Sequence, residues 1–273
     1  MIMSLTLFHG PLSGRPAEAN YRIEGPAHRL FFDDFPRRVR AKYAGQTLLD
    51  TRRGKLLHET GLLPQLYVPR QDARFDMLEA TDRKTHCPFK GDACYWSVRV
   101  GERAVQNAVW AYPQPSEAAA WLRDYIAVYW ATMDAWFDED EAVEGHLRDP
   151  YHRVDVRETS HHLRVCVQAD VVAETKRPKI LSETGLANRY YVPPADIRAD
   201  LFEPSATQTV CPYKGVASYR ALRIGDQRIE DVAWLYAEPL PDAGKIGGYL
   251  CFDLAEGLTI EIDGAPVPGR KDK

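Results

Sequence analysis

Apolar side chains occupy every second position in two separate stretches of the chain, residues 39–43 and 163–167. A period of two is typical of a strand with one buried face, so we expect strands there. Each stretch leads through a short turn into a second apolar run, at 47–49 and 171–173. Each half of the chain is therefore predicted to open with two consecutive strands.

Strands are also predicted at residues 95–100 and 219–224, and each meets a turn that begins with glycine, which is typical of a hairpin. Residues 116–137 are ambiguous, because their Ala, Leu and Glu content favours a helix. The corresponding segment in the second half of the chain, residues 247–264, has a strand–turn–strand pattern and contains glycines that a long helix does not tolerate. Since two copies share a fold, we expect strands at 125–130 and 134–137, after a short helical turn at 116–121.

Four motifs recur at a fixed distance of 124 residues (183 − 59 = 124), without a gap. They are Glu59-Thr60-Gly61-Leu62 with Glu183-Thr184-Gly185-Leu186, Tyr67-Val68-Pro69 with Tyr191-Val192-Pro193, Cys87-Pro88-Phe89-Lys90-Gly91 with Cys211-Pro212-Tyr213-Lys214-Gly215, and Trp110-x-Tyr112 with Trp234-x-Tyr236. A period this long exceeds that of solenoid repeats, so it indicates two copies of a whole domain. The predicted fold class is mainly β, with two tandem copies of a small domain.

The chain is expected to contain two repeats, together with an arm, a linker and a tail that are not part of the repeated sequence. Residues 1–30 are rich in Gly and Pro and are predicted to be an N-terminal arm. The first repeat is predicted at 31–143, a polar linker at 144–152, and the second repeat at 153–267. Residues 268–273 are predicted to be a frayed tail.

The motifs resemble the family known as domain of unknown function 427, here in tandem, and the resemblance covers nearly the whole chain after residue 30. It implies a β-tent fold, related in shape to the translationally controlled tumour protein. The family also carries a nucleotidyltransferase-like label. Many other β-tent proteins hold zinc with paired CxxC motifs, which this chain lacks, so the resemblance implies no metal here.

Bulk composition narrows the function classes. The 273 residues are 45% hydrophobic and 27% charged, as in ordinary globular proteins, and the net charge is −4. No global positive field favours nucleic acid, and the arginines of residues 37–40 are interpreted as the solvated face of a strand. We expect no membrane span and no signal peptide, because no run of about 20 apolar residues occurs and the N-terminus lacks a basic flank. Five cysteines without a CxxC argue against a disulfide framework, and a cytoplasmic location is expected.

The repeated polar residues are the candidates for chemistry, and each has a structural alternative. Cys87 is either a nucleophilic or redox-sensitive thiol or a small buried residue that closes a loop. Lys90 either holds a phosphate or carboxylate or pairs with an acid such as Glu59. Glu59 in turn is a general base or a turn cap. The repeated Tyr and Trp rings are either core residues or the walls of a site for a flat ligand. The complete candidate set for ligand binding is Glu59, Tyr67, Cys87, Lys90, Trp110, Tyr112, Glu183, Tyr191, Cys211, Lys214, Trp234 and Tyr236.

The repeated arginines and the histidines are also considered as possible binding or catalytic residues. Arg53 and Arg177 recur beside threonines, and they are interpreted either as anion clamps or as charges that promote solubility. Histidine is not expected to recur at the offset, so neither a Cys–His pair nor a metal site common to both repeats is predicted. The histidines considered are His28, His146, His152, His161 and His162.

Three functions from different classes follow. The first is a small-molecule site in each repeat for an anionic or nucleotide-like ligand, with catalysis left open. The second is a non-catalytic binding or interaction module. The third is nucleotidyl transfer, which the family label suggests and which needs carboxylates holding a metal near a phosphate. Catalytic residues, cofactors and the oligomeric state are not specified by the sequence.

Overall fold

The computed structural model describes residue 18 and residues 20–143, 145–168, 170–253 and 257–267. The chain divides into two compact units, Met1–Tyr151 and His152–Lys273, which are described separately.

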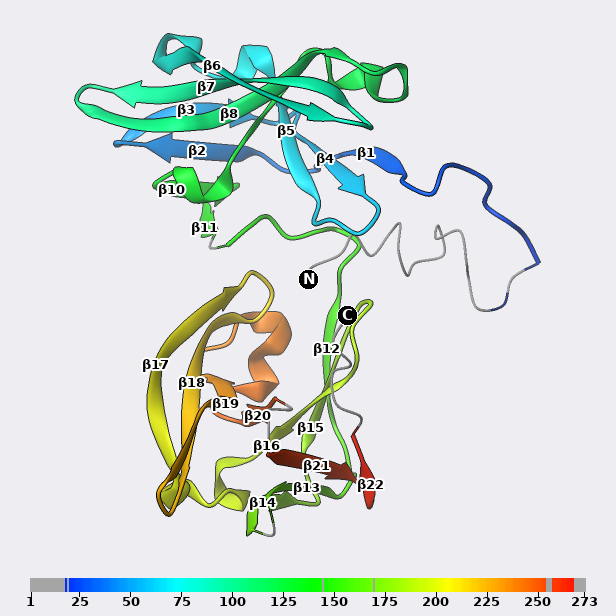
Figure 1. The fold of residues 1–273 in the computed structure, drawn as a ribbon, viewed down its shortest axis with the longest axis vertical. Coiled ribbons are helices and arrows are strands. Elements are labelled where there is room, and N and C mark those ends of the chain that lie inside the picture. Colours follow the sequence, from blue (N-terminus) through cyan, green and yellow to red (C-terminus); the bar gives the residue numbers. More distant parts are fainter. Residues whose placement is uncertain (1–17, 19, 144, 169, 254–256, 268–273) are drawn as a thin grey trace. The chain divides into compact units, whose positions relative to one another are not determined.

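The first unit consists of two antiparallel sheets (Figure 1). Among the described residues, one sheet has the strand order β1-β4-β5-β9-β8-β7-β6, and the other has the order β11-β10-β2-β3. The strands are β1 (Leu30–Asp34), β2 (Val39–Tyr43), β3 (Gln46–Thr51), β4 (Lys55–Glu59), β5 (Gln65–Pro69), β6 (Leu78–Cys87), β7 (Gly91–Val100), β8 (Arg103–Pro115), β9 (Tyr125–Val128), β10 (Ala135–Asp138) and β11 (Glu141–Val143). Short 3-10 helices connect them: η1 (Arg70–Asp72), η2 (Phe75–Met77), η3 (Glu117–Leu122) and η4 (Trp130–Thr132).

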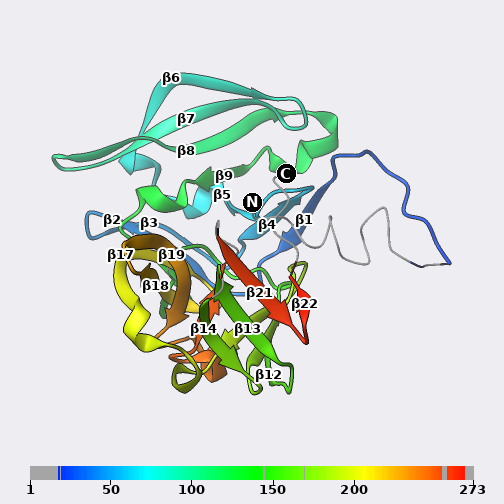
Figure 2. The ribbon, with the colours of Figure 1, turned by 60° about the horizontal axis from the view of Figure 1, so that its bottom comes forward.

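The second unit has the same arrangement, with the sheet orders β12-β15-β16-β20-β19-β18-β17 and β14-β13-β21-β22 in its described part. Figure 2 shows the smaller sheet with β13, β14, β21 and β22 side by side. The strands are β12 (Val154–Glu158), β13 (Leu163–Val167), β14 (Asp170–Thr175), β15 (Lys179–Glu183), β16 (Arg189–Val192), β17 (Phe202–Cys211), β18 (Gly215–Ile224), β19 (Gln227–Tyr236), β20 (Leu250–Phe252), β21 (Leu258–Ile262) and β22 (Ala265–Pro266), and the 3-10 helices are η5 (Pro194–Asp196), η6 (Ala199–Leu201) and η7 (Pro241–Ile246).

The prediction of a mainly β chain in two tandem copies is confirmed. The alternating stretches form β2 and β13, whose side chains are alternately buried and half-buried. The ambiguous segment contains η3, β9 and β10, so the transfer of the strand–turn–strand pattern from the second copy is correct. The predicted bounds are wrong at Tyr129 and Trp130, because β9 ends at Val128 and Trp130 begins η4, and at Asp134, which precedes β10. There the Trp130 carbonyl accepts a hydrogen bond from the Trp136 indole at 3.0 Å, and the two rings stack at 4.0 Å.

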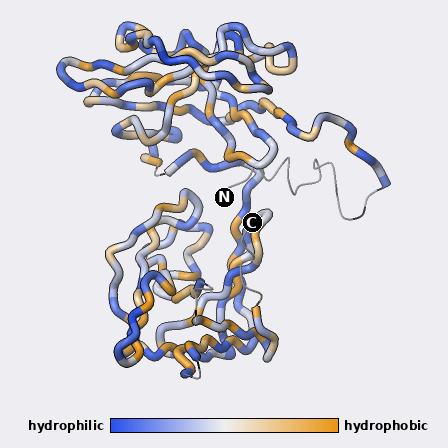
Figure 3. Tube along the Cα trace, in the orientation of Figure 1, coloured by the Kyte–Doolittle hydropathy of each residue, from blue (hydrophilic) through white to orange (hydrophobic). Residues whose placement is uncertain are grey.

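The seven-stranded sheet of each unit is buried on both faces in its central part. In β4 of the first unit, Leu56 belongs to a core shared with the four-stranded sheet, while Leu57 belongs to a second core on the opposite face. The same alternation separates Val68 from Tyr67 and Val109 from Trp110. Figure 3 shows that hydrophobic positions occur along the chain in both units. The period of two thus places the motif residues of different strands on a single face, the face of the second core.

Candidate functional site

Three charged or titratable side chains meet beside the second core of the first unit. Lys90 donates a hydrogen bond from its ammonium group to Glu59 Oε1. The other carboxylate oxygen, Oε2, lies 3.3 Å from His28 Nε2. The Glu59 and Lys90 side chains are only 7% and 10% exposed, whereas that of His28 is 19% exposed. We call His28, Glu59 and Lys90 the first centre.

The second unit contains the equivalent set, which we call the second centre: His152, Glu183 and Lys214. Lys214 Nζ lies 2.6 Å from Glu183 Oε2, and His152 Nε2 lies 2.9 Å from Glu183 Oε1. All three side chains are 10% exposed. In both centres the lysine holds one carboxylate oxygen and the imidazole the other, so the ion pair that was one interpretation of the repeated lysines is present twice.

The Glu-Thr-Gly-Leu motif brings the histidine segment to the glutamate. Thr60 Oγ1 accepts a hydrogen bond from the backbone N–H of Arg29 at 3.0 Å, and Thr60 N–H donates to the Arg29 carbonyl at 3.2 Å. Thr184 clamps Arg153 with the same two bonds, at 2.9 and 3.0 Å. Since Arg29 and Arg153 directly follow His28 and His152, the threonine fixes the backbone next to each imidazole.

The Cys-Pro-aromatic-Lys-Gly motif forms a tight turn that places the lysine next to the glutamate of its centre. In the second unit Lys214 N–H donates to the Cys211 carbonyl at 3.2 Å, and the Lys214 carbonyl accepts from Leu240 N–H at 3.1 Å. Gly215 has a φ of +99°, and a Cβ atom there would lie 3.3 Å from the Glu238 carbonyl oxygen. Only glycine fits this close backbone approach without strain.

The aromatic residue of the same turn covers the histidine. The Phe89 ring stacks on His28 with centroids 3.8 Å apart, and Tyr213 lies over His152 at 4.1 Å. Phe89 is 41% exposed and Tyr213 only 7% exposed. The stack of aromatic ring and imidazole therefore reaches the surface in the first unit and is closed over in the second.

The repeated tyrosines and tryptophans are core residues of the second core in each unit. Tyr67 and Tyr191 are each 1% exposed. Burial, the largest cause, raises the pKa of both phenols well above the usual value, with further contributions from Tyr112 and Cys251. Both tyrosines are therefore neutral hydrogen-bonding groups at physiological pH. The remaining candidates, Cys87, Trp110, Tyr112, Cys211, Trp234 and Tyr236, pack in or against the same two cores.

Electrostatics in the second centre favours a charged glutamate. Burial is the largest influence and by itself raises the pKa of Glu183. The hydrogen bond from His152 and the charge of Lys214 act in the opposite direction and together outweigh it, so the pKa of Glu183 lies below its ordinary value. The second centre thus combines a carboxylate and an ammonium group in a largely buried place.

The expectation that no histidine recurs is wrong, because His28 and His152 are separated by the same offset (152 − 28 = 124). They lie in the predicted arm and linker, outside the predicted repeats. The spacing carries a signal that would have found them. In each copy the histidine, glutamate and lysine follow one another at intervals of 31 residues.

The arginines weighed as anion clamps are instead bound to carboxylates of their own unit. Arg177 contacts Asp196 through Nε and Nη2 at 3.1 and 3.0 Å, and Thr175 donates to the same carboxylate at 2.7 Å. Arg53 binds Asp72 in the same way. We call these two sets the threonine–arginine–aspartate clamps. They fasten the ends of β14 and β3 to the neighbouring 3-10 helices.

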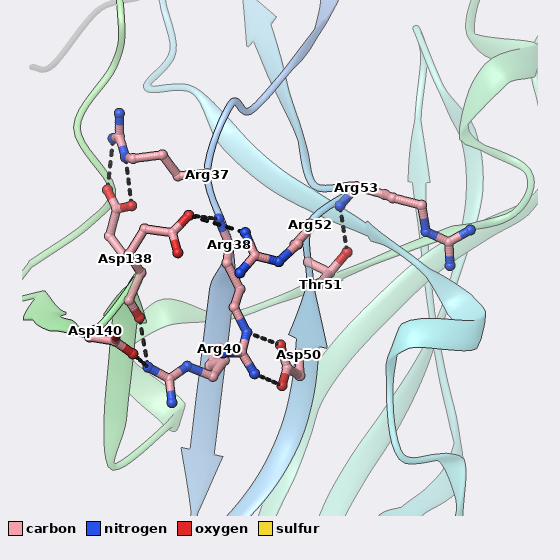
Figure 4. A network of polar contacts seen from close by, with 10 residues as sticks. Arg37, Arg38, Arg40, Asp50, Thr51, Arg52, Arg53, Asp138 and Asp140 are labelled. Carbon is pink, nitrogen blue, oxygen red and sulfur yellow. Dashed lines mark hydrogen bonds and ion pairs between the residues drawn. The ribbon is translucent and has the colours of Figure 1, made fainter.

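The basic cluster at residues 37–40 is likewise matched by acids (Figure 4). Arg37 Nε lies 2.6 Å from Asp138 Oδ1, and Arg38 makes two hydrogen bonds to Asp50. Arg40 contacts Asp140 at 2.9 Å. These arginines therefore link β2 and the segment before it to the neighbouring acidic residues.

Open clefts occur elsewhere on each unit. One of about 730 Å³ in the first unit is lined by Arg53, Pro69, Arg70, Gln71, Ala73, Phe75, Asp124 and Tyr125. Another of about 450 Å³ in the second unit is lined by His162, Glu174, Thr175, Lys176, Arg177 and Asp196. Neither lining includes a residue of a centre.

The residues that the structure describes contain no group of three or more His, Cys, Asp or Glu side chains that could hold a metal ion. None of the helices in the described ranges has the length and apolar character that a membrane crossing requires.

Comparison with known proteins identifies a family for most of the chain. A family model described as a domain of unknown function, DUF427, matches residues 32–139 and again residues 155–264. No curated protein matches the chain. The two matched segments cover most of the two sheet pairs and end before β11 and β22, and His28 and His152 lie just before them.

Proposed function

The chain belongs to the DUF427 family, with two domains in tandem, and we propose that each domain binds a small anionic molecule at its centre, with the histidine as the contact residue. One observation carries the proposal: three separate segments of each repeat bring a histidine, a glutamate and a lysine together, and they do so twice. The two sets act as an internal comparison within one chain.

The energetic argument concerns buried charge. Moving a carboxylate and an ammonium group out of water costs several kcal/mol for each ion, and replacing such a pair by apolar residues is often neutral or stabilising. Stability alone therefore does not explain why the Glu–Lys pair is present in both repeats. A bound ligand would give a reason to keep the pair, because the glutamate and the lysine together orient the imidazole that contacts the ligand.

The chemistry follows from the charges. Lysine and glutamate neutralise each other, so a centre with a neutral imidazole has no net charge, and a protonated imidazole gives it one positive charge. An anion is therefore expected to bind together with a proton. The glutamate orients the ring through one nitrogen, as carboxylates do for catalytic histidines, and this leaves the other nitrogen to contact a carboxylate or phosphate ester. Proton transfer to or from a bound ligand is the catalytic step that such a centre supports.

The alternative is a non-catalytic interaction module, and the closure of the centres favours it. The Glu–Lys pairs are complete without a ligand, and Tyr213 covers His152. Nucleotidyl transfer ranks third. The repeated aspartates that could hold its metal are each paired with an arginine: Asp72, Asp76, Asp196 and Asp200. Asp72 and Asp196 also accept a hydrogen bond from a threonine.

The test is titration calorimetry of the full chain with inorganic phosphate, acetate, citrate and adenosine monophosphate, in two buffers that differ in ionisation enthalpy. We expect binding with proton uptake. His28→Gln and His152→Gln are each expected to remove one site, and the double variant to remove both. His86→Gln and His162→Gln change exposed, ion-paired histidines and serve as controls. No binding by any probe, or binding that survives the double variant, would favour the interaction module.

A further inference from the structure

His58 is a buried histidine that belongs to neither centre. Its side chain is 0% exposed, and neither ring nitrogen has a hydrogen-bond partner among the residues that the structure describes. Buried polar groups almost always have such partners, so this ring requires an explanation. His58 lies in β4 immediately before Glu59, and because strand side chains alternate, it faces away from the first centre.

The ring is covered by the segment that follows β11, residues 147–151, which we call the strap. Tyr151 lies edge-on to the His58 ring at 5.6 Å between centroids, and Phe31 of β1 lies at the same distance on a tilted plane. The strap is anchored at both ends of this contact. Leu147 is buried, and the Tyr151 hydroxyl donates to Asp33 Oδ2 at 2.5 Å.

The titratable groups that face His58 are Asp33 of β1 and Asp149 and Tyr151 of the strap. Asp149 Oδ2 lies 4.0 Å from His58 Nδ1, beyond hydrogen-bonding distance, and Asp149 Oδ1 already accepts from Tyr151 N–H at 2.9 Å. Burial lowers the pKa of His58 more than the charges of Asp149 and Asp33 raise it. The hydrogen bond to Asp33, with burial, raises the pKa of Tyr151 to about 12, so its hydroxyl is neutral.

The equivalent position of the second repeat has a different residue and a different strand partner. The residue equivalent to His58 is Ser182 (58 + 124 = 182), and it is exposed. Its strand partner is Asp155, where the first repeat has Phe31. The buried histidine and its aromatic surroundings are therefore specific to the first repeat.

We propose that His58 is a proton-sensitive latch, which holds the strap on β1 and β4 while the imidazole is neutral and releases it when the ring takes up a proton. A charged imidazole needs a hydrogen-bond acceptor, and in the packed arrangement no acceptor of the described residues lies within hydrogen-bonding distance of either ring nitrogen. Opening the strap exposes the ring to water and so favours the protonated form. The ordinary pKa of histidine is about 6.5, so release is expected as the pH falls below about 6.5 and is absent above it.

The latch does not depend on the proposed ligand site.

The experiment is hydrogen exchange of the full chain, followed by mass spectrometry for peptides that cover the strap. Measurements run from about pH 8 to about pH 5.5, with each rate corrected for the chemical pH dependence of exchange. One linked proton changes the opening equilibrium by up to about tenfold per pH unit, so strap exchange is expected to rise as the pH falls, by no more than that factor. His58→Phe keeps an aromatic ring between Phe31 and Tyr151 and is expected to make strap exchange independent of pH.

Two further variants complete the test. His86→Gln alters an exposed histidine of the same unit and is expected to keep the wild-type pH dependence. Asp149→Asn removes the nearest carboxylate, which makes the packed protonated ring less stable, so the acid-dependent rise is expected to extend to lower pH; it also serves if His58→Phe does not fold. Strap exchange that is independent of pH in the wild type, that slows in acid, or that rises equally in His58→Phe would overturn the proposal.

Discussion

Removing the lysine of the first centre is predicted to destabilise the first unit strongly. In Lys90→Met the side chain keeps most of its length and loses its charge, and the Glu59 carboxylate is left 7% exposed with only His28 beside it, at 3.3 Å. Breaking a buried ion pair on one side costs about 3–5 kcal/mol, because the remaining charge stays buried. The contact with His28 offsets part of this cost, so we expect a loss of about 3 kcal/mol in the free energy of unfolding.

The matched control is Lys55→Met, the same substitution in the same unit. Lys55 pairs with Asp34, whose side chain is 81% exposed, and exposed ion pairs contribute about 1 kcal/mol or less. A second control removes both buried charges in Glu59→Gln/Lys90→Met. The double variant is expected to be more stable than the sum of the two single changes predicts, by at least about 1 kcal/mol.

Urea unfolding followed by tryptophan fluorescence measures these differences, because five of the six tryptophans report on the first unit: Trp96, Trp110, Trp121, Trp130 and Trp136. With a denaturant slope of about 1–3 kcal/mol per molar, a loss of about 3 kcal/mol lowers the midpoint by about 1 M or more. Equal midpoints for Lys90→Met and Lys55→Met would refute the reasoning, since they would mean that burial does not raise the cost of the lost charge.

Three shorter predictions concern the second unit. Because the folded pKa of Glu183 is lowered, its contribution to stability is complete above the unfolded value of about 4.3 and is lost as the pH falls through the lower folded value; Glu183→Gln is expected to remove this acid-dependent loss in unfolding titrations. Gly215→Ala is expected to lower the unfolding free energy by more than about 1 kcal/mol and by more than Gly225→Ala, whose Cβ would meet nothing within 4 Å. Thr184→Val removes the side-chain hydrogen bond to Arg153 N–H and keeps the backbone one, and it is expected to cost about 1 kcal/mol in urea unfolding followed by the fluorescence of Trp234, whereas an unchanged midpoint would contradict that role.

The strands were predictable because each carries a local signal. The alternation at 39–43 and 163–167 identifies β2 and β13 without any knowledge of their partners. The comparison of the two copies then corrected a helical propensity at 125–137. Trp130 escaped this reasoning, because a single turn of 3-10 helix between two strands has no periodicity of its own.

The centres were only half predictable, for a topological reason. Glu59 and Lys90 were both identified from the repeat, but strand order is not local information, and their meeting depends on how β4, β5, β9, β8 and β7 pair. The histidines were missed because they lie in segments without a hydrophobic pattern. His58 could not be found at all, since it has no counterpart in the second copy and its importance comes from burial under the strap.

Retention of the same residues in both copies does not by itself distinguish a ligand site from a structural device. The threonine–arginine–aspartate clamps are retained as faithfully as the centres, and they fasten strands to 3-10 helices. Their arginines are 55% and 69% exposed, so these charges remain solvated and cost little to keep. The centres are also ion pairs that recur in both repeats, but their environment is the opposite one. Both partners of each Glu–Lys pair are about nine-tenths buried. A clamp needs no such burial. The cost of desolvation therefore makes the centres, rather than the clamps, the first places to test for a bound ligand.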